Sequence, residues 1–182
     1  MVAELFMPGV WWLHGTRGSN VYLVEAGAEL VLIDTGFGDS ARGIAREVEE
    51  VAPGRTVSKI LLTHAHVDHA GAAGLLREAY GAEVVAGLAD CAWRGERWLL
   101  RERVGNSHWL RGLLAAIRRR ALPVVVVDQA LEGELEVAAG IIAVPVPGHT
   151  PGSYCYLDVA RGVAFVGDLV ISHTEWLARP LK

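Results

Sequence analysis

In Lys59-Ile60-Leu61-Leu62-Thr63-His64-Ala65-His66-Val67-Asp68-His69-Ala70-Gly71, an apolar run leads directly into three histidines and one aspartate. The aliphatic run predicts a buried strand, and the polar loop leaves its carboxyl end, where α/β proteins place their chemistry. The whole chain holds 7 histidines, so three of them in one short loop are more than a polar turn requires. Because neutral imidazole is the commonest ligand for zinc and similar metals, we interpret the loop as a metal site.

The composition predicts one domain, spanning residues 1–182, that acts on a small molecule. With 182 residues and 52% hydrophobic composition, the chain can bury one sizeable core, and no linker-like segment divides it. The net charge of −4 gives no general attraction to nucleic acid or to anionic lipid, so neither partner is expected. A small-molecule substrate is the better expectation, and formation of a homo-oligomer stays open.

The compartment predicted from the sequence is the cytoplasm. The first residues lack a basic region followed by an apolar core, and no uninterrupted apolar stretch reaches the roughly 18 residues needed to cross a membrane. The cysteines, Cys91 and Cys155, are too few and too far apart to suggest a disulfide framework. We expect Cys155 to be a small buried residue on a strand.

Strand and helix signals alternate along the chain, which predicts an α/β layout. Asp39 or Ser40 is expected to cap a helix that ends near Val51, and Gly81 to end a second helix over Gly71–Tyr80. Gly71 is expected to let the chain turn tightly into that second helix. The predicted strands, of which the first three should share one sheet, are 9–13, 20–25, 30–33, 57–62, 82–86, 124–127, 133–137, 141–146, 153–158 and 163–166.

The segment from Cys91 to Arg120 differs from the rest, because it holds eight of the fifteen arginines together with Trp93, Trp98 and Trp109. We expect it to form helices at the mouth of the site. Basic and aromatic side chains there would suit an anionic substrate, but arginine stems also cover helix surfaces without any function. Both readings stay open.

Two later elements complete a pattern with the histidine loop. His149 stands on a constrained turn in Val146-Pro147-Gly148-His149-Thr150-Pro151-Gly152-Ser153, and Asp168 ends a strand in Val166-Gly167-Asp168. Together with Leu32-Ile33-Asp34-Thr35-Gly36, these residues closely resemble the metallo-β-lactamase superfamily of metal-dependent hydrolases. The resemblance covers nearly the whole chain and implies an α/β (α+β) fold, the four-layer αββα sandwich of that family.

The resemblance also implies a site for two divalent metal ions. His64, His66 and His149 would hold one ion, Asp68 and His69 would hold a second, and Asp168 would bridge both, because its two oxygens can each neutralise one cation. Zinc is the first expectation for this ligand set, although iron and manganese accept similar ligands. Asp34 resembles the aspartate that orients a ligand histidine by hydrogen bonding, and we do not take it as a ligand.

The chain departs from the family pattern at its end. Family members continue past the bridging aspartate through a helix to a further histidine ligand, whereas only fourteen positions follow Asp168 here (182 minus 168). His173 comes too soon after Asp168 to replace that ligand. We therefore expect a shortened chain, with the last strand and helix missing or incomplete and a second metal site that is weak or empty.

The function that the resemblance implies is hydrolysis of a small acyl compound, an ester, thioester or lactone, by a metal-bound hydroxide, with Asp68 also acting as the catalytic proton acceptor. The turn that begins with Trp11 and Trp12 would line the pocket mouth together with the arginine-rich segment. Alternatives in the same fold are a phosphodiesterase or nuclease, an iron-dependent persulfide oxygenase, and an inactive metal-binding fragment.

Overall fold

The computed structural model of the chain describes residues 3–94, 97–101 and 124–170. The helices are α1 (Ala41–Val51), α2 (Val67–Ala70) and α3 (Ala73–Tyr80), with short 3-10 turns η1 (Gly38–Ser40), η2 (Leu88–Asp90) and η3 (Gly167–Leu169). The strands are β1 (Glu4–Met7), β2 (Val10–Leu13), β3 (Val21–Ala26), β4 (Glu29–Ile33), β5 (Lys59–Leu61), β6 (Glu83–Gly87), β7 (Cys91–Arg94), β8 (Arg97–Leu100), β9 (Val126–Val127), β10 (Gln129–Leu131), β11 (Leu135–Ala138), β12 (Ile141–Pro145), β13 (Tyr154–Asp158) and β14 (Val163–Phe165).

The larger sheet has seven strands in the order β1-β2-β3-β4-β5-β6-β10. Its first four strands are antiparallel, and β4, β5, β6 and β10 run parallel. Along β4, Leu30 and Leu32 face one hydrophobic cluster while Val31 and Ile33 face the other, as the period of two in a strand requires. A strand buried on both faces reads as a continuous apolar run, which is why the sequence signal is strong here.

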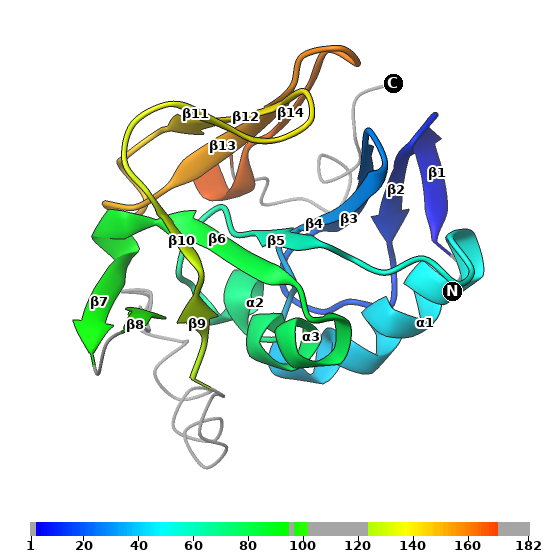
Figure 1. The fold of residues 1–182 in the computed structure, drawn as a ribbon, viewed down its shortest axis with the longest axis horizontal. Helices are drawn as coiled ribbons and strands as arrows, with labels where there is room; N and C mark the ends of the chain where they lie inside the picture. The colour runs from blue at the N-terminus through cyan, green and yellow to red at the C-terminus, as the bar shows by residue number, and fades with distance from the viewer. Residues whose placement is uncertain (1–2, 95–96, 102–123, 171–182) are drawn as a thin grey trace.

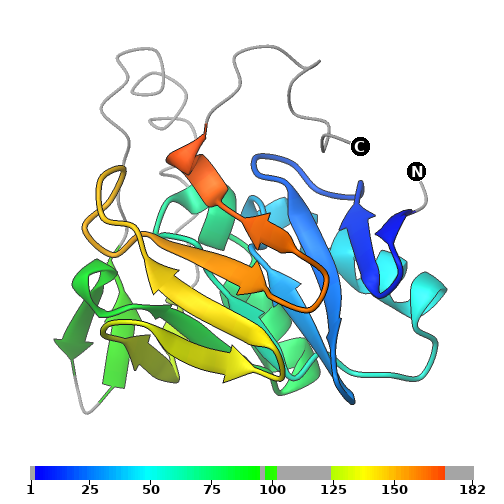
Figure 2. The same cartoon turned by 90° about the horizontal axis from the view of Figure 1, so that it is seen from above.

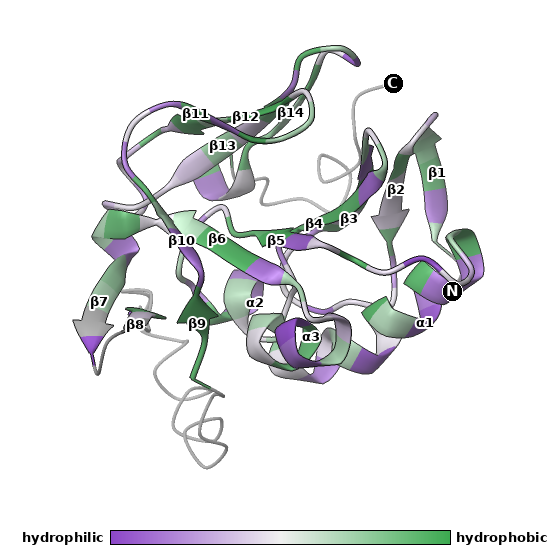
Figure 3. Cartoon of the chain, viewed as in Figure 1, coloured by the Kyte–Doolittle hydropathy of each residue, from purple (hydrophilic) through white to green (hydrophobic). Residues whose placement is uncertain are grey.

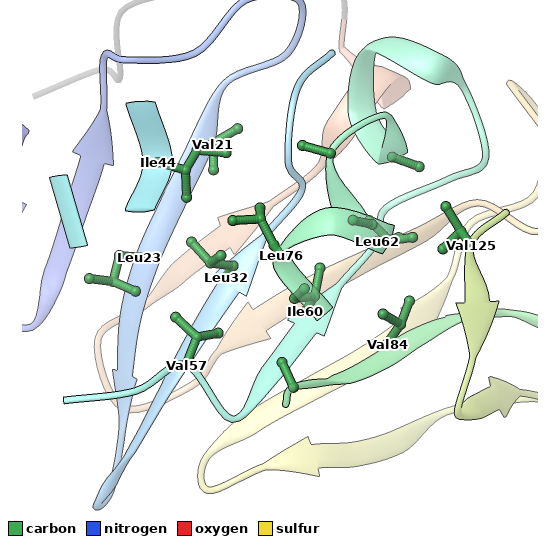
Figure 4. Close-up of a cluster of buried hydrophobic side chains, with 14 of the residues drawn as sticks. Val21, Leu23, Leu32, Ile44, Val57, Ile60, Leu62, Leu76, Val84 and Val125 are labelled. Atoms are coloured by element: carbon green, nitrogen blue, oxygen red, sulfur yellow. The ribbon is translucent and has the colours of Figure 1, made fainter. Parts of the chain in front are cut away.

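Helices α1 and α3 cover one face of this sheet (Figure 1). Ile44 and Val48 from α1 and Leu76 from α3 pack against the inward side chains of β3, β4, β5 and β6, and several of these side chains appear in Figure 4. Apart from Glu47, which is buried, the charged residues of both helices lie toward the outer side, as the hydropathy colours of Figure 3 show. Amphipathic helices thus bury one stripe of side chains against the sheet.

A second, four-stranded antiparallel sheet, β11-β12-β13-β14, covers the other face (Figure 2). Tyr154, Tyr156 and Phe165 pack on Ile33 and Leu61 of the larger sheet. The described residues thus form three layers, helices, sheet and sheet, of the expected αββα sandwich. No helix among the described residues lies on the outer face of the second sheet.

The elements expected from the sequence are present, with several corrections. Strands β1 and β10 were not predicted, and the described part of the arginine-rich segment is the β7–β8 hairpin rather than a helix. Trp93 and Trp98 are register partners in the backbone of that hairpin, and tryptophan is enriched in strands. Residues 102–120 of that segment, for which helices were also predicted, lie outside the described part of the chain.

Ser40 precedes α1 as expected, but its hydroxyl does not cap the helix. Instead, Oγ of Ser40 accepts a hydrogen bond from the backbone N–H of Arg17, at 3.0 Å, and so holds the β2–β3 loop. Gly81 does end α3, in the left-handed conformation with φ 67°.

Gly71 is required for a different reason than expected. Its φ of −62° is ordinary helical backbone, so no unusual turn demands a glycine. A Cβ atom there would lie 2.4 Å from the carbonyl oxygen of Val67 and 2.8 Å from the backbone nitrogen of Gly38. The glycine therefore permits close approach of two chain segments beneath the histidine loop.

Glu47 is fully buried on α1, and neither carboxylate oxygen has a hydrogen-bond partner among the described residues. Burying an unpaired polar group costs free energy, so Glu47→Met is expected to raise the free energy of unfolding by about 1–2 kcal/mol in urea titrations. Glu50→Met, at an exposed position on the same helix, is the control and should change stability by less than about 0.5 kcal/mol. A loss of stability in Glu47→Met would mean that the carboxylate is paired.

Among the described residues, no helix combines the length and apolar character needed to span a bilayer.

Candidate metal centre

The predicted ligands meet at one edge of the sheet sandwich, where four chain segments end. The histidine loop follows β5 directly, and Asp34 follows the neighbouring parallel strand β4. His149 lies on the turn between β12 and β13, and Asp168 lies in η3, just after β14. Carboxyl ends of parallel strands meet at one edge, so local strand order brings the first two segments together.

Three imidazoles converge on one point. Nδ1 of His66 lies 3.0 Å from Nε2 of His64 and 2.8 Å from Nε2 of His149. Together with Asp168, these residues offer four ligand atoms that all lie within 4.8 Å of one another. His64 is buried, and the side chain of His149 is 29% exposed. The cluster is therefore buried on the side of His64 and open to solvent on the side of His149.

The Asp168 carboxylate lies between two histidines, one for each predicted metal site. Its Oδ2 lies 3.3 Å from Nε2 of His149, and its Oδ1 lies 3.1 Å from Nε2 of His69. Gly167, with φ 51°, makes this placement fit, because a Cβ atom there would lie 2.6 Å from Oγ1 of Thr63. This geometry suits the predicted bridging role.

Asp34 holds the histidine loop from behind. Its Oδ1 accepts the backbone N–H of Thr63, and its Oδ2 accepts Oγ1–H of Thr63 and Nδ1–H of His69, each at 2.8 Å. Because the Thr63 hydroxyl donates to Asp34, it accepts from Nδ1–H of His64, at 3.1 Å. That contact leaves Nε2 of His64 unprotonated and free to coordinate.

The electrostatics separate the histidines into two kinds. Burial, reinforced by His69 and His66, lowers the pKa of His64 to about 2, and burial also lowers the pKa of His66. Burial works against the protonated form of His69 too, but the carboxylates of Asp34 and Asp168 outweigh it and raise its pKa to about 10. Neutral His64 and His66 are the forms that bind metals. The two carboxylates favour the protonated form of His69, so its Nε2 would have to release a proton in order to coordinate an ion.

The donor set fits a divalent metal ion. In a tetrahedral zinc site with Zn–N bonds of 2.0–2.1 Å, neighbouring ligand nitrogens lie about 3.3 Å apart, close to the contacts of His66. A cavity of about 10 Å³ adjoins His64, His149 and Asp168, and a cavity of that size holds about one water-sized particle. Nitrogen lone pairs that face one another are best satisfied by a shared cation.

Neither Asp68 nor His69 belongs to the group of four described residues whose possible ligand atoms all lie within 4.8 Å of one another. Asp68 lies in α2, its charge partly offsets the lowering of the pKa of His66, and its backbone carbonyl accepts the N–H of Ser19, at 2.9 Å. The β2–β3 loop, which follows Trp11 and Trp12, therefore borders the site through Ser19. His173 lies outside the described residues.

Two residues that the sequence pattern does not single out, Thr63 and Asp90, hydrogen-bond to the loops that carry the predicted ligands. Thr63 connects Asp34 to His64, as described above. Asp90 is fully buried and accepts hydrogen bonds from both ligand-bearing loops. A signal for Asp90 does exist, because it follows the parallel strand β6 at the same sheet edge as Asp34.

The chain belongs to the metallo-beta-lactamase superfamily, whose sequence profile matches residues 14–180. It is 33% identical over 150 residues to the uncharacterized protein YobT of Bacillus subtilis, covering 82% of this chain and 60% of the relative. It is also 33% identical over 140 residues to a hydroxyacylglutathione hydrolase of Anaeromyxobacter dehalogenans, covering 75% of this chain and 41% of that protein. The human acyl-coenzyme A thioesterase MBLAC2 is 28% identical, over 93% of this chain and 67% of its own length.

Solved structures confirm the fold. A metallo-beta-lactamase of Cronobacter sakazakii with a HARLDQ motif superposes with a TM-score of 0.64 and 27% identity, covering 90% of this chain and 62% of that one. This chain therefore spans 60% and 41% of the lengths of the first two relatives and 62% of the solved structure.

Proposed function

We propose that this chain is a metal-dependent hydrolase of a small acyl compound, an ester, thioester or lactone. The observation that carries the proposal is the convergence of His64, His66 and His149 on one point beside a carboxylate. The names of two relatives, a hydroxyacylglutathione hydrolase and an acyl-coenzyme A thioesterase, support an acyl substrate.

His64, His66 and His149 would hold one divalent ion, Asp68 and His69 would contribute to a second, and Asp168 would contact both. When bound, such an ion supplies Lewis acidity and lowers the pKa of a water molecule to near neutrality. Zinc suits imidazole and carboxylate ligands, and elemental analysis of unsupplemented protein identifies the metal. Occupancy of the second site is expected to be the weaker of the two.

Residues behind the site orient the side chains that would bind the metal. Thr63 and Asp34 fix the rings of His64 and His69 by hydrogen bonds to Nδ1, so that each Nε2 is directed into the site. Asp68, beside His66, is the group we assign as proton acceptor. The open side, next to exposed His149, admits substrate.

An apolar cavity beside the histidine loop supports an acyl substrate. Its volume is about 300 Å³, at the small end of ligand-binding cavities. Ala65 and Val67, which alternate with the predicted ligands, form part of its wall, and Leu99 lies in the wall contributed by β8. Arg94 and Arg101, both exposed, also line it, and their guanidinium groups suit an anionic part of the substrate.

Leu99→Trp tests this cavity as the acyl-binding site. The larger ring is expected to reduce kcat/KM for an octanoyl thioester by about tenfold or more, while an acetyl thioester changes by less than about threefold, because only the long chain competes with the ring. Leu75→Trp, at an exposed position on α3, should leave both values unchanged. Equal effects on both substrates would place the acyl chain elsewhere.

The reaction class is tested with a panel of thioesters, lactones and phosphodiesters, together with metal stoichiometry of the same preparation. Turnover of a thioester or lactone that is lost with chelator and restored by added metal is the expected result. Turnover confined to phosphodiesters would contradict an acyl substrate, and a preparation that takes up no metal would contradict the proposal altogether.

A further inference from the structure

Asp90 is a buried carboxylate outside the predicted ligand set, at the end of η2 and 0% exposed. Its Oδ2 accepts the backbone N–H of Ala65, at 3.1 Å, and the hydroxyl of Thr150, at 2.6 Å. Its Oδ1 accepts the backbone N–H of Gly152, at 3.1 Å. A charged acceptor makes such hydrogen bonds stronger than neutral ones.

These three donors belong to the two loops that carry the imidazoles. Ala65 lies between His64 and His66, while Thr150 and Gly152 lie in the turn that carries His149. His66 and His149 are 83 positions apart in sequence. One carboxylate thus joins the two halves of the three-histidine cluster.

The turn that carries His149 packs closely against Asp90. The Thr150 N–H donates to Oγ of Ser153, at 3.0 Å, and the two hydroxyls lie 2.9 Å apart. Since the Thr150 hydroxyl donates to Asp90, it accepts from Ser153, so the donors form one directed chain. A Cβ atom on Gly152 would lie 2.6 Å from the backbone nitrogen of Asp90, so only glycine allows this approach.

We propose that Asp90 is a positioning residue that sets the distance of His149 from His64 and His66 and thereby the affinity of the metal site. The proposal rests on the metal site proposed above. In the described part of the chain, the ring of His149 contacts the other residues of the site, namely His64, His66 and Asp168. The hydrogen bonds of its turn to Asp90 fix the backbone from which this ring projects. An asparagine has one acceptor oxygen and would direct an N–H group at one of these donors, so it cannot replace the carboxylate.

The test measures Zn²⁺ affinity by competition with a chromophoric chelator and the visible absorption of the Co²⁺-loaded protein. Asp90→Asn and Thr150→Val are each expected to weaken Zn²⁺ binding about 10- to 100-fold and to alter the Co²⁺ spectrum, as changes behind metal ligands do. Thr150→Ser, which keeps the hydroxyl, should restore affinity to within about threefold of the parent. In the double variant, the two losses should add only in part, because both remove the hydrogen bond between Asp90 and Thr150.

Asp128→Asn is the matched control. Asp128 also accepts three hydrogen bonds, two from Arg77 and one from the N–H of Val84, but it is not among the residues of the metal cluster. The Asp128→Asn variant should have a lower free energy of unfolding than the parent, with the same Zn²⁺ affinity and the same Co²⁺ spectrum. Affinity that falls equally in Asp128→Asn, or that survives in both Asp90→Asn and Thr150→Val, would overturn the proposal.

Amide hydrogen exchange on metal-free protein separates this inference from the proposed function. Faster exchange at Gly152 and Ala65 in Asp90→Asn, relative to Asp128→Asn, would support the positioning role even if the parent chain failed to bind metal. Unchanged exchange at both amides would count against it, whatever the metal content of the parent.

Discussion

Replacing His149 with alanine is expected to abolish metal-dependent hydrolysis and to weaken metal binding more than the 10- to 100-fold typical of residues that only orient ligands. The imidazole supplies one of the two nitrogens that lie within 3.0 Å of Nδ1 of His66, and it also faces Asp168. Its partial exposure means that removal leaves no buried cavity, so folding should be retained.

The measurement combines metal content, by elemental analysis after gel filtration, with thioester or lactone turnover. His14→Ala is the control, because His14 also contacts an aromatic ring and a carboxylate, Trp12 and Glu4, yet lies outside the cluster. The control should keep its metal. Unaltered metal content in His149→Ala would refute the assignment of this residue as a ligand.

Asp34→Ala is expected to lower the free energy of unfolding of the chelator-treated protein by about 3–5 kcal/mol, because it removes one partner of a buried pair. The change leaves the ring of His69 and both donors of Thr63 without their acceptor in a site where Asp34 is 2% exposed. Metal binding should weaken as well, since His69 loses the contact that orients its ring.

Asp34 is also the only non-glycine residue with positive φ in the described chain, at 58°. Asp34→Gly removes the same carboxylate but tolerates this backbone, so it should be more stable than Asp34→Ala by about 1 kcal/mol. Asp34→Asn keeps one acceptor and should lose less than either. Urea unfolding of the three variants gives these differences, and a loss below about 1 kcal/mol in Asp34→Ala would show that the carboxylate is not essential to the loop.

Much of the fold could be predicted because its strongest signals are local. Strands β4 and β5 are buried on both faces and therefore read as apolar runs, and the glycine that ends α3 is visible in the sequence. The β7–β8 hairpin could not be predicted in the same way. Arginines and tryptophans suit an amphipathic helix as well as a strand, and cross-strand pairing decides between the two.

The local sequence determined that His64, His66 and His69 share one loop, because five positions of chain cannot separate them, and that this loop follows a buried strand. Tertiary structure decided the rest of the site. His149 reaches His66 only because the second sheet packs on the first. Two hydrogen bonds join the sheets there: the hydroxyl of Tyr156 donates to the carbonyl of Leu62, and the N–H of Tyr154 donates to the carbonyl of Thr63, each at 2.8 Å. The role of Asp90 depends on the same packing. Contacts between segments so distant in sequence are fixed by the fit of two buried sheet faces, which no single stretch of residues encodes.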